Sequence, residues 1–147
     1  MGLGRIAASF AVALLPASAT AQGGPPDLDC SLGFAKLRQS AAALPGAHQG
    51  NDGRFDQIAV GEPDVWTVEF AFTAPGQAPH PAVMLRTFRK QVTGVWTAQS
   101  KGCGYGDQAA FAGLMSEMKA RDSELTNASR QDVERRKQEQ SPLGGTP

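Results

Sequence analysis

Two cysteines, Cys30 and Cys103, are the feature that most constrains how this chain can fold. A disulfide between them would tie the start of the domain to a distant segment and remove loop-closure entropy from the unfolded state, a stabilisation of roughly 4 kcal/mol. Because the chain has two cysteines, this is the one intramolecular pairing available. A reactive thiol is one alternative, but the pair lacks CxxC spacing and no partner base is identifiable. An intermolecular bridge is the other alternative.

The first 21 residues have the pattern of a secretory signal peptide, which would place both cysteines in an oxidising compartment. Arg5 gives a positive start, residues 6–15 (IAASFAVALL) are apolar, and Ala19-Thr20-Ala21 is a small-x-small cleavage site. The apolar run is about half of the roughly twenty residues that span a bilayer, so we favour removal over an uncleaved anchor. The abundance of alanine and glycine favours a Gram-negative bacterium, and we therefore expect a periplasmic or secreted protein.

The cleaved chain has the length and charge of one small domain. We predict a single α+β domain over 22–140 and a disordered tail over 141–147. Without Arg5, 13 basic residues oppose 14 acidic ones, a net charge near −1. No basic stripe or polybasic cluster indicates a nucleic acid or a membrane surface. No second apolar run approaches membrane-spanning length, so we expect no membrane contact after cleavage.

Helical periodicity marks the two ends of the domain. Near the start, Asp27 or Asp29 can cap a helix that ends at Pro45-Gly46. Near the end, Asp107 is a suitable N-cap for a long helix to about Glu139. Each helix has apolar residues three or four positions apart, as expected for one buried face. These residues are Cys30, Phe34, Leu37, Ala41 and Leu44 in the first helix, and Phe111, Leu114, Met115, Met118 and Leu125 in the second.

The middle of the chain reads as strands. We predict strands over 55–60 and 65–73, the second with strict alternation of large apolar and smaller residues. Residues 82–90 and 95–99 fit either a hairpin through Thr93-Gly94 or a helix beginning at Pro81, and β-branched and aromatic content favours the hairpin. We expect loops over 47–54 and 101–107.

These elements predict an α+β two-layer sandwich. An antiparallel meander sheet of about four strands would be covered on one face by the N-terminal and C-terminal helices. The covered face would carry the bulky side chains of the central strand, namely Trp66, Val68, Phe70 and Phe72. The opposite face, with Thr67, Glu69 and Arg86, would remain polar or be available to a partner.

No catalytic or metal-binding motif is present in the sequence. His48 and His80 lie in predicted loops without a second ligand at HxxxH or CxxC spacing. The Asn51-Asp52-Gly53 segment fails as a calcium loop and fits an Asx-type turn instead. Gly102, Gly104 and Gly106 are a weak anion signal, better explained by a sharp turn around a disulfide. We predict no metal and no cofactor, and the candidate binding residues are His80, His48, Trp66, Trp96 and Tyr105.

The function that fits these observations best is an exported periplasmic binding or accessory protein without catalytic activity. It would present a sheet face, or the concavity between sheet and helices, to an unknown protein or small ligand, and not to nucleic acid. The alternative is a small exported enzyme, hydrolase-like, using His80 or His48 with a carboxylate such as Glu69 or Asp56. A third possibility is self-assembly through the long C-terminal helix.

Overall fold

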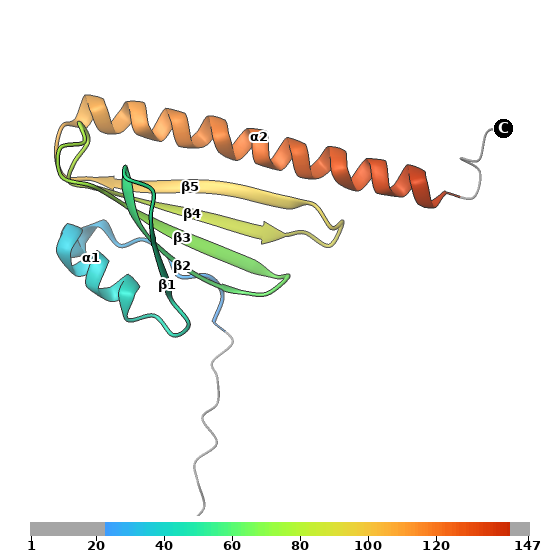
Figure 1. Cartoon of the computed structure of the whole chain (residues 1–147), viewed down its shortest axis with the longest axis horizontal. Helices are drawn as coiled ribbons and strands as arrows, with labels where there is room; N and C mark the ends of the chain where they lie inside the picture. The colour runs from blue at the N-terminus through green and yellow to red at the C-terminus, as the bar shows by residue number, and fades with distance from the viewer. Residues whose placement is uncertain (1–22, 142–147) are drawn as a thin grey trace, which may run out of the picture.

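The computed structural model describes residues 23–141 (Figure 1). The predicted signal peptide and the predicted tail, apart from Ser141, lie outside the described residues. None of the described helices is both long and apolar enough to cross a membrane. In chain order the elements are η1 (Cys30–Leu32), α1 (Gly33–Ala42), β1 (His48–Asn51), β2 (Phe55–Glu62), β3 (Trp66–Thr73), β4 (Ala82–Lys90), β5 (Trp96–Gly104) and α2 (Gln108–Gln140).

The strands form an antiparallel meander, which confirms the predicted α+β class and the hairpin over 82–99. The order in the sheet is β1-β2-β3-β4-β5, so the sheet has five strands and not about four. The additional strand, β1, lies within the predicted loop 47–54. Its sequence, HQGN, contains no β-branched or bulky residue, and it becomes a strand by pairing with β2. The turn between them is the predicted Asx type, because Asn51 Oδ1 accepts a hydrogen bond from the Gly53 amide at 2.8 Å.

The two helices lie on opposite faces of the sheet, so the prediction of two layers with both helices on one face is wrong (Figure 1). The α1 helix packs through Leu37 and Ala41 on the predicted bulky face, which includes Phe70 and Phe72. The α2 helix packs on the other face through the residues Phe111, Leu114, Met115 and Met118, which contact Phe55, Ala71 and Met84. Residues 82–85 are buried on both faces, which makes β4 the centre of a three-layer domain.

Two glycines of β5 let α2 approach the sheet closely. A Cβ atom on Gly104 would lie 2.5 Å from Cγ of Phe111, and one on Gly102 would lie 2.7 Å from Sδ of Met115. These glycines do not turn the chain around the disulfide as predicted, because β5 continues through both of them to Gly104. Their role is to make space for the first turns of α2, which begins at the predicted cap, Asp107.

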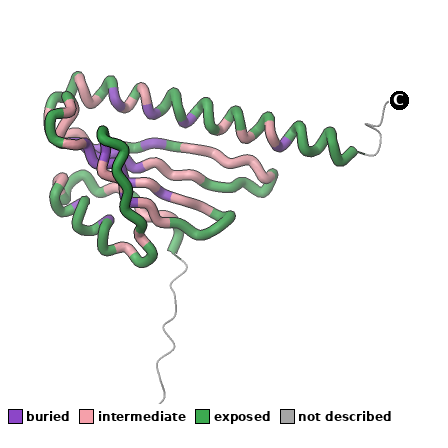
Figure 2. Tube along the Cα trace, in the orientation of Figure 1, coloured by how far each residue is buried: buried purple, intermediate pink, exposed green. Residues whose placement is uncertain are grey.

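Side chains of α2 also cover the outer edge of β5. The Trp96 amide donates to Ser129 Oγ at 2.8 Å, and the Ala98 amide donates to Thr126 Oγ1 at 3.0 Å. Both amides belong to an edge strand, whose unpaired N–H groups would otherwise be free to pair with another chain. Figure 1 shows β5 nearest to α2 and β1 farthest from it. The second half of the helix is largely exposed (Figure 2).

Candidate functional site

The α2 face of the sheet consists of rows of side chains that run across the strands and change in character along the helix. Antiparallel register places one residue from each of β3, β4 and β5 in every row. The row under the start of α2 is apolar and closed, the next is polar, and the third is apolar and open. In that order the rows are Ala71–Met84–Gly102, Glu69–Arg86–Ser100 and Thr67–Phe88–Ala98.

A groove of about 580 Å³ lies between the open row and the second half of α2. Its surface is mostly apolar, and Leu125, which borders it, leaves 46% of its surface exposed. Asp132 is the charged residue in its lining, and it forms ion pairs along α2 with Arg135 and Arg136. The lining residues are Thr67, Phe88, Trp96, Thr97, Ala98, Leu125, Ala128, Ser129 and Asp132. An exposed apolar hollow of this size is the feature of the described surface best suited to a ligand.

The polar row lies next to this groove, on the side toward the start of α2. Arg86 reaches from β4 to Asp122 on α2, with Nη2 3.2 Å from Oδ1, and the two side chains are only 13% and 7% exposed. The Arg86 guanidinium also lies over the Phe88 ring, 5.1 Å from its centroid, and therefore connects the polar row to the groove. Asp122 Oδ2 and Ser100 Oγ are buried without a hydrogen-bond partner. Buried polar atoms of this kind are costly unless a ligand or a water molecule satisfies them.

Two of the candidate binding residues belong to this side of the molecule. Trp96 lines the groove at the start of β5. His48 lies on the exposed strand β1, in line with the polar row. Its register partner on β2 is Ala59, and the partner of Ala59 on β3 is Glu69. His48 is therefore on the same face as the groove but separated from Arg86 by two strands.

His80 has a structural environment in the loop before β4. Its Nδ1 lies 2.9 Å from the Thr73 carbonyl oxygen and 3.1 Å from Thr73 Oγ1, and its ring packs edge-on against Phe34. The Thr73 hydroxyl in turn donates to the Ala82 carbonyl and accepts from the Ala82 amide. Within residues 23–141, no ion pair joins either histidine to a carboxylate.

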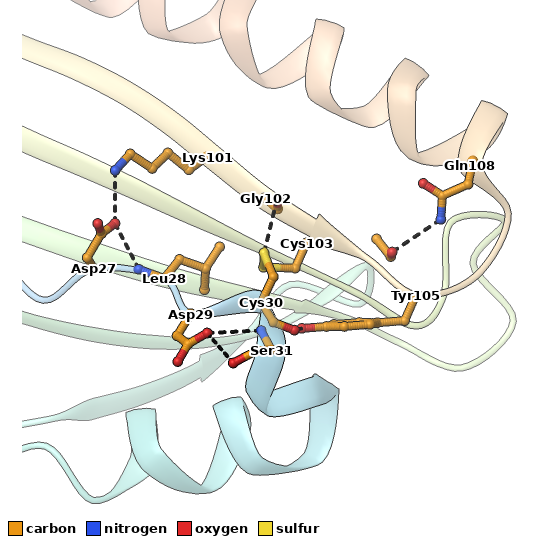
Figure 3. Close-up of a disulfide and its surroundings, with 11 residues drawn as sticks. Asp27, Leu28, Asp29, Cys30, Ser31, Lys101, Gly102, Cys103, Tyr105 and Gln108 are labelled. Atoms are coloured by element: carbon orange, nitrogen blue, oxygen red, sulfur yellow. Dashed lines mark hydrogen bonds and ion pairs between the residues drawn. A yellow bond between two sulfur atoms is a disulfide. The ribbon is translucent and has the colours of Figure 1, made fainter.

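Tyr105 lies beside the disulfide on the α1 side (Figure 3). Cys30 and Cys103 are bonded as predicted, with 5.4 Å between their Cα atoms. The Tyr105 hydroxyl donates to the Cys30 carbonyl oxygen at 2.8 Å, and burial raises the pKa of this phenol. Lys101 pairs with Asp27 at 2.9 Å and lowers the pKa of that carboxyl group mainly by hydrogen bonding. These contacts fasten the segment before α1 across the sheet.

Trp66 lies on the α1 face, so the five candidate residues do not form one site. Sequence analysis missed most of the groove, including Phe88 and Leu125 on its two walls. It also missed the buried pair of Arg86 and Asp122, for which a signal exists. Asp122 follows Met118 by four residues and precedes Leu125 by three, so it places a charge on the apolar stripe of α2.

Comparison with known proteins gives no further assignment, because no family model, curated protein or solved structure matches this chain. Within the described residues, no group of three His, Cys, Asp or Glu side chains is placed to hold a metal ion. The candidate site therefore rests on geometry alone.

Proposed function

We propose that this protein is an exported binding module whose ligand site is the groove between α2 and the sheet. The observation that carries the proposal is the open apolar row beside Leu125. This row borders an open groove, although α2 passes directly alongside it. The disulfide supports an oxidising location, as expected for a periplasmic or secreted protein.

The hydrolase-like alternative has less support. The alternative pairs a histidine with a carboxylate, but Nδ1 of His80 lies within hydrogen-bond distance of two Thr73 oxygens, and within the described residues no ion pair joins His80 to a carboxylate. His48 lies on an exposed edge strand rather than in a pocket with a carboxylate. Binding without chemistry is therefore the function that the geometry supports best.

A neutral fluorescent probe, N-phenyl-1-naphthylamine, tests this proposal in the oxidised chain without its leader. We expect saturable binding, and we expect Ala128→Trp to weaken it at least tenfold because the indole fills the groove. Ala120→Trp is the matched control, since Ala120 is exposed on α2 and does not line the groove. Equal probe affinity in both variants, or no saturable binding by the wild type, would overturn the proposal.

A further inference from the structure

We propose that the groove takes an amphipathic ligand with a cationic amine head, whose apolar part lies between Phe88 and Leu125 and whose ammonium group meets the polar row. This inference rests on the proposed function and assigns the chemical class of the ligand. Three observations support it: the charges of the row, its unpartnered atoms, and its position next to the groove.

The polar row and its partner on α2 contain more negative than positive charge. Glu69 and Asp122 supply two carboxylates, and Arg86 supplies one guanidinium. Arg86 directs both Nε and Nη2 to the same oxygen, Asp122 Oδ1, at 3.3 and 3.2 Å. No ion pair within the described chain reaches Glu69, although it is the register partner of Arg86. One additional positive charge would balance this row.

The unpartnered atoms of the row are suited to a hydrogen-bond donor. Asp122 Oδ2 is an acceptor without a donor, and Ser100 Oγ can accept as well as donate. An ammonium group carries three donors and a compact charge, so it can satisfy carboxylate oxygens from Glu69 and Asp122 together. A neutral hydroxyl would satisfy fewer of these acceptors and would leave the charge unbalanced.

The position of the row relative to the groove gives the ligand its amphipathic character. Phe88 follows Arg86 by two residues on the same face of β4, a separation of about 6–7 Å. Leu125 lies about one helical turn beyond Asp122. A head beside the polar row therefore continues into a tail over Phe88, with Leu125 as the opposite wall.

The polar row disfavours an anionic head. Glu69 and Asp122 both belong to this part of the face, whereas Asp132, the charged residue of the groove lining, is paired with Arg135 and Arg136. A carboxylate beside the polar row would therefore meet like charge, and its desolvation would not be offset by an unpaired cation in that row. Fatty-acid-like anions are disfavoured for this reason.

Isothermal titration with three eight-carbon probes at pH 7 tests the inference. They are octylamine, which is protonated at this pH, 1-octanol and octanoate, each below its aggregation limit. We expect octylamine to bind at least tenfold more tightly than 1-octanol, and octanoate more weakly than both. Glu69→Gln should reduce the preference for octylamine over 1-octanol, because the ammonium group then loses one of its two carboxylates. Glu62→Gln is the matched control, because Glu62 is exposed at the end of β2 on the other face of the sheet.

The outcomes separate this inference from the proposed function. Equal binding of octylamine and 1-octanol, or equal effects of the two glutamate variants, would overturn the assignment of an amine head. If the neutral naphthylamine probe still binds and Ala128→Trp still blocks it, the groove remains a binding site and only the ligand class is wrong. Buried water at Ser100 and Asp122 would then explain the unpartnered atoms.

Discussion

Arg86 of β4 and Asp122 of α2 form an ion pair inside the domain, with Nη2 3.2 Å from Oδ1 and both side chains largely buried. The pair lies between the apolar contacts of the first half of α2 and the groove beside its second half. It therefore marks the boundary between the part of the helix that builds the core and the part that borders the candidate site.

Removing one partner of this pair should be strongly destabilising. Asp122→Ala leaves the Arg86 charge buried without a partner, and we expect a loss of about 3–5 kcal/mol in the free energy of unfolding. Replacing both partners, Arg86→Met with Asp122→Leu, should cost much less because no charge is then buried. Urea denaturation measures both. A double variant as unstable as Asp122→Ala would show that the loss is not caused by the unpaired charge.

The disulfide should stabilise the oxidised protein only. Its sequence separation of 73 residues corresponds to roughly 4 kcal/mol of loop-closure free energy. Cys103→Ser should therefore lower the melting temperature of oxidised protein and leave that of reduced protein almost unchanged. Thermal unfolding with and without reductant makes the comparison. Equal losses in both conditions would mean that burial of Cys103, and not the bond, supplies the stability.

Two glycine-to-alanine changes should act in opposite directions. Gly104→Ala places a methyl group 2.5 Å from Phe111 Cγ, so α2 must shift, and we expect a loss of about 1–3 kcal/mol from overpacking. Gly113→Ala meets no atom within 4 Å on an exposed position of α2 and should stabilise by about 0.5–1 kcal/mol. Chemical denaturation of the pair is the measurement. If Gly104→Ala left the free energy of unfolding unchanged, this would contradict the close packing of α2 on β5.

The hydroxyl groups that cover the β5 edge should protect its amides. Ser129→Ala removes the acceptor of the Trp96 amide, so we expect faster hydrogen exchange at Trp96 and a loss of about 1–2 kcal/mol. Ser123→Ala is a suitable control, because its hydroxyl bonds only to a carbonyl on the exposed side of α2. Unchanged hydrogen exchange at Trp96 in Ser129→Ala would show that the Ser129 hydroxyl does not protect this amide.

The Arg54–Glu117 pair should make the free energy of unfolding depend on pH in the acidic range, below the ordinary pKa of a glutamate. Hydrogen bonding to Arg54 is the main cause that lowers the pKa of Glu117 from its ordinary value of 4.5. Because the folded-state pKa is the lower one, the stabilisation is present above pH 4.5 and is lost as the pH falls through the folded-state value. The Glu117 side chain is 37% exposed, so we expect less than about 1 kcal/mol.

Glu117→Gln tests this pH dependence in melting curves between pH 7 and pH 3. The variant should be slightly less stable than wild type at pH 7 and should converge with it at the acidic end. Glu124→Gln serves as a control, because Glu124 is exposed on the same helix and shows no ion pair within the described chain. A constant difference across the whole range would contradict the assignment.

Periodicity in the sequence was sufficient to predict the elements that bury a continuous stripe. Leu37 and Ala41 of α1, and Leu114 and Met118 of α2, are buried as their spacing predicts. The four residues of β1 gave no such signal, because a polar edge strand is defined by its partner and not by its own side chains. The disulfide was predictable because only one intramolecular pairing was possible.

The side of the sheet on which α2 packs was not predictable from the alternation in β3. That pattern shows one bulky face, whereas the second face is closed by small residues, such as Ala71 and Gly102, against large side chains that α2 itself supplies. The groove could not be predicted from the sequence for a related reason. Phe88 and Leu125 come together only because of strand register and the path of α2, and neither residue stands out in its own segment.

The most direct test of the groove as the ligand site is an NMR titration of the ¹⁵N-labelled oxidised protein with N-phenyl-1-naphthylamine. We expect saturable amide shift changes that cluster at Thr67, Phe88, Ala98, Leu125 and Ala128, the two walls of the groove. Changes confined to β1 or to the α1 face, or no saturable change at any amide, would contradict the placement of the site.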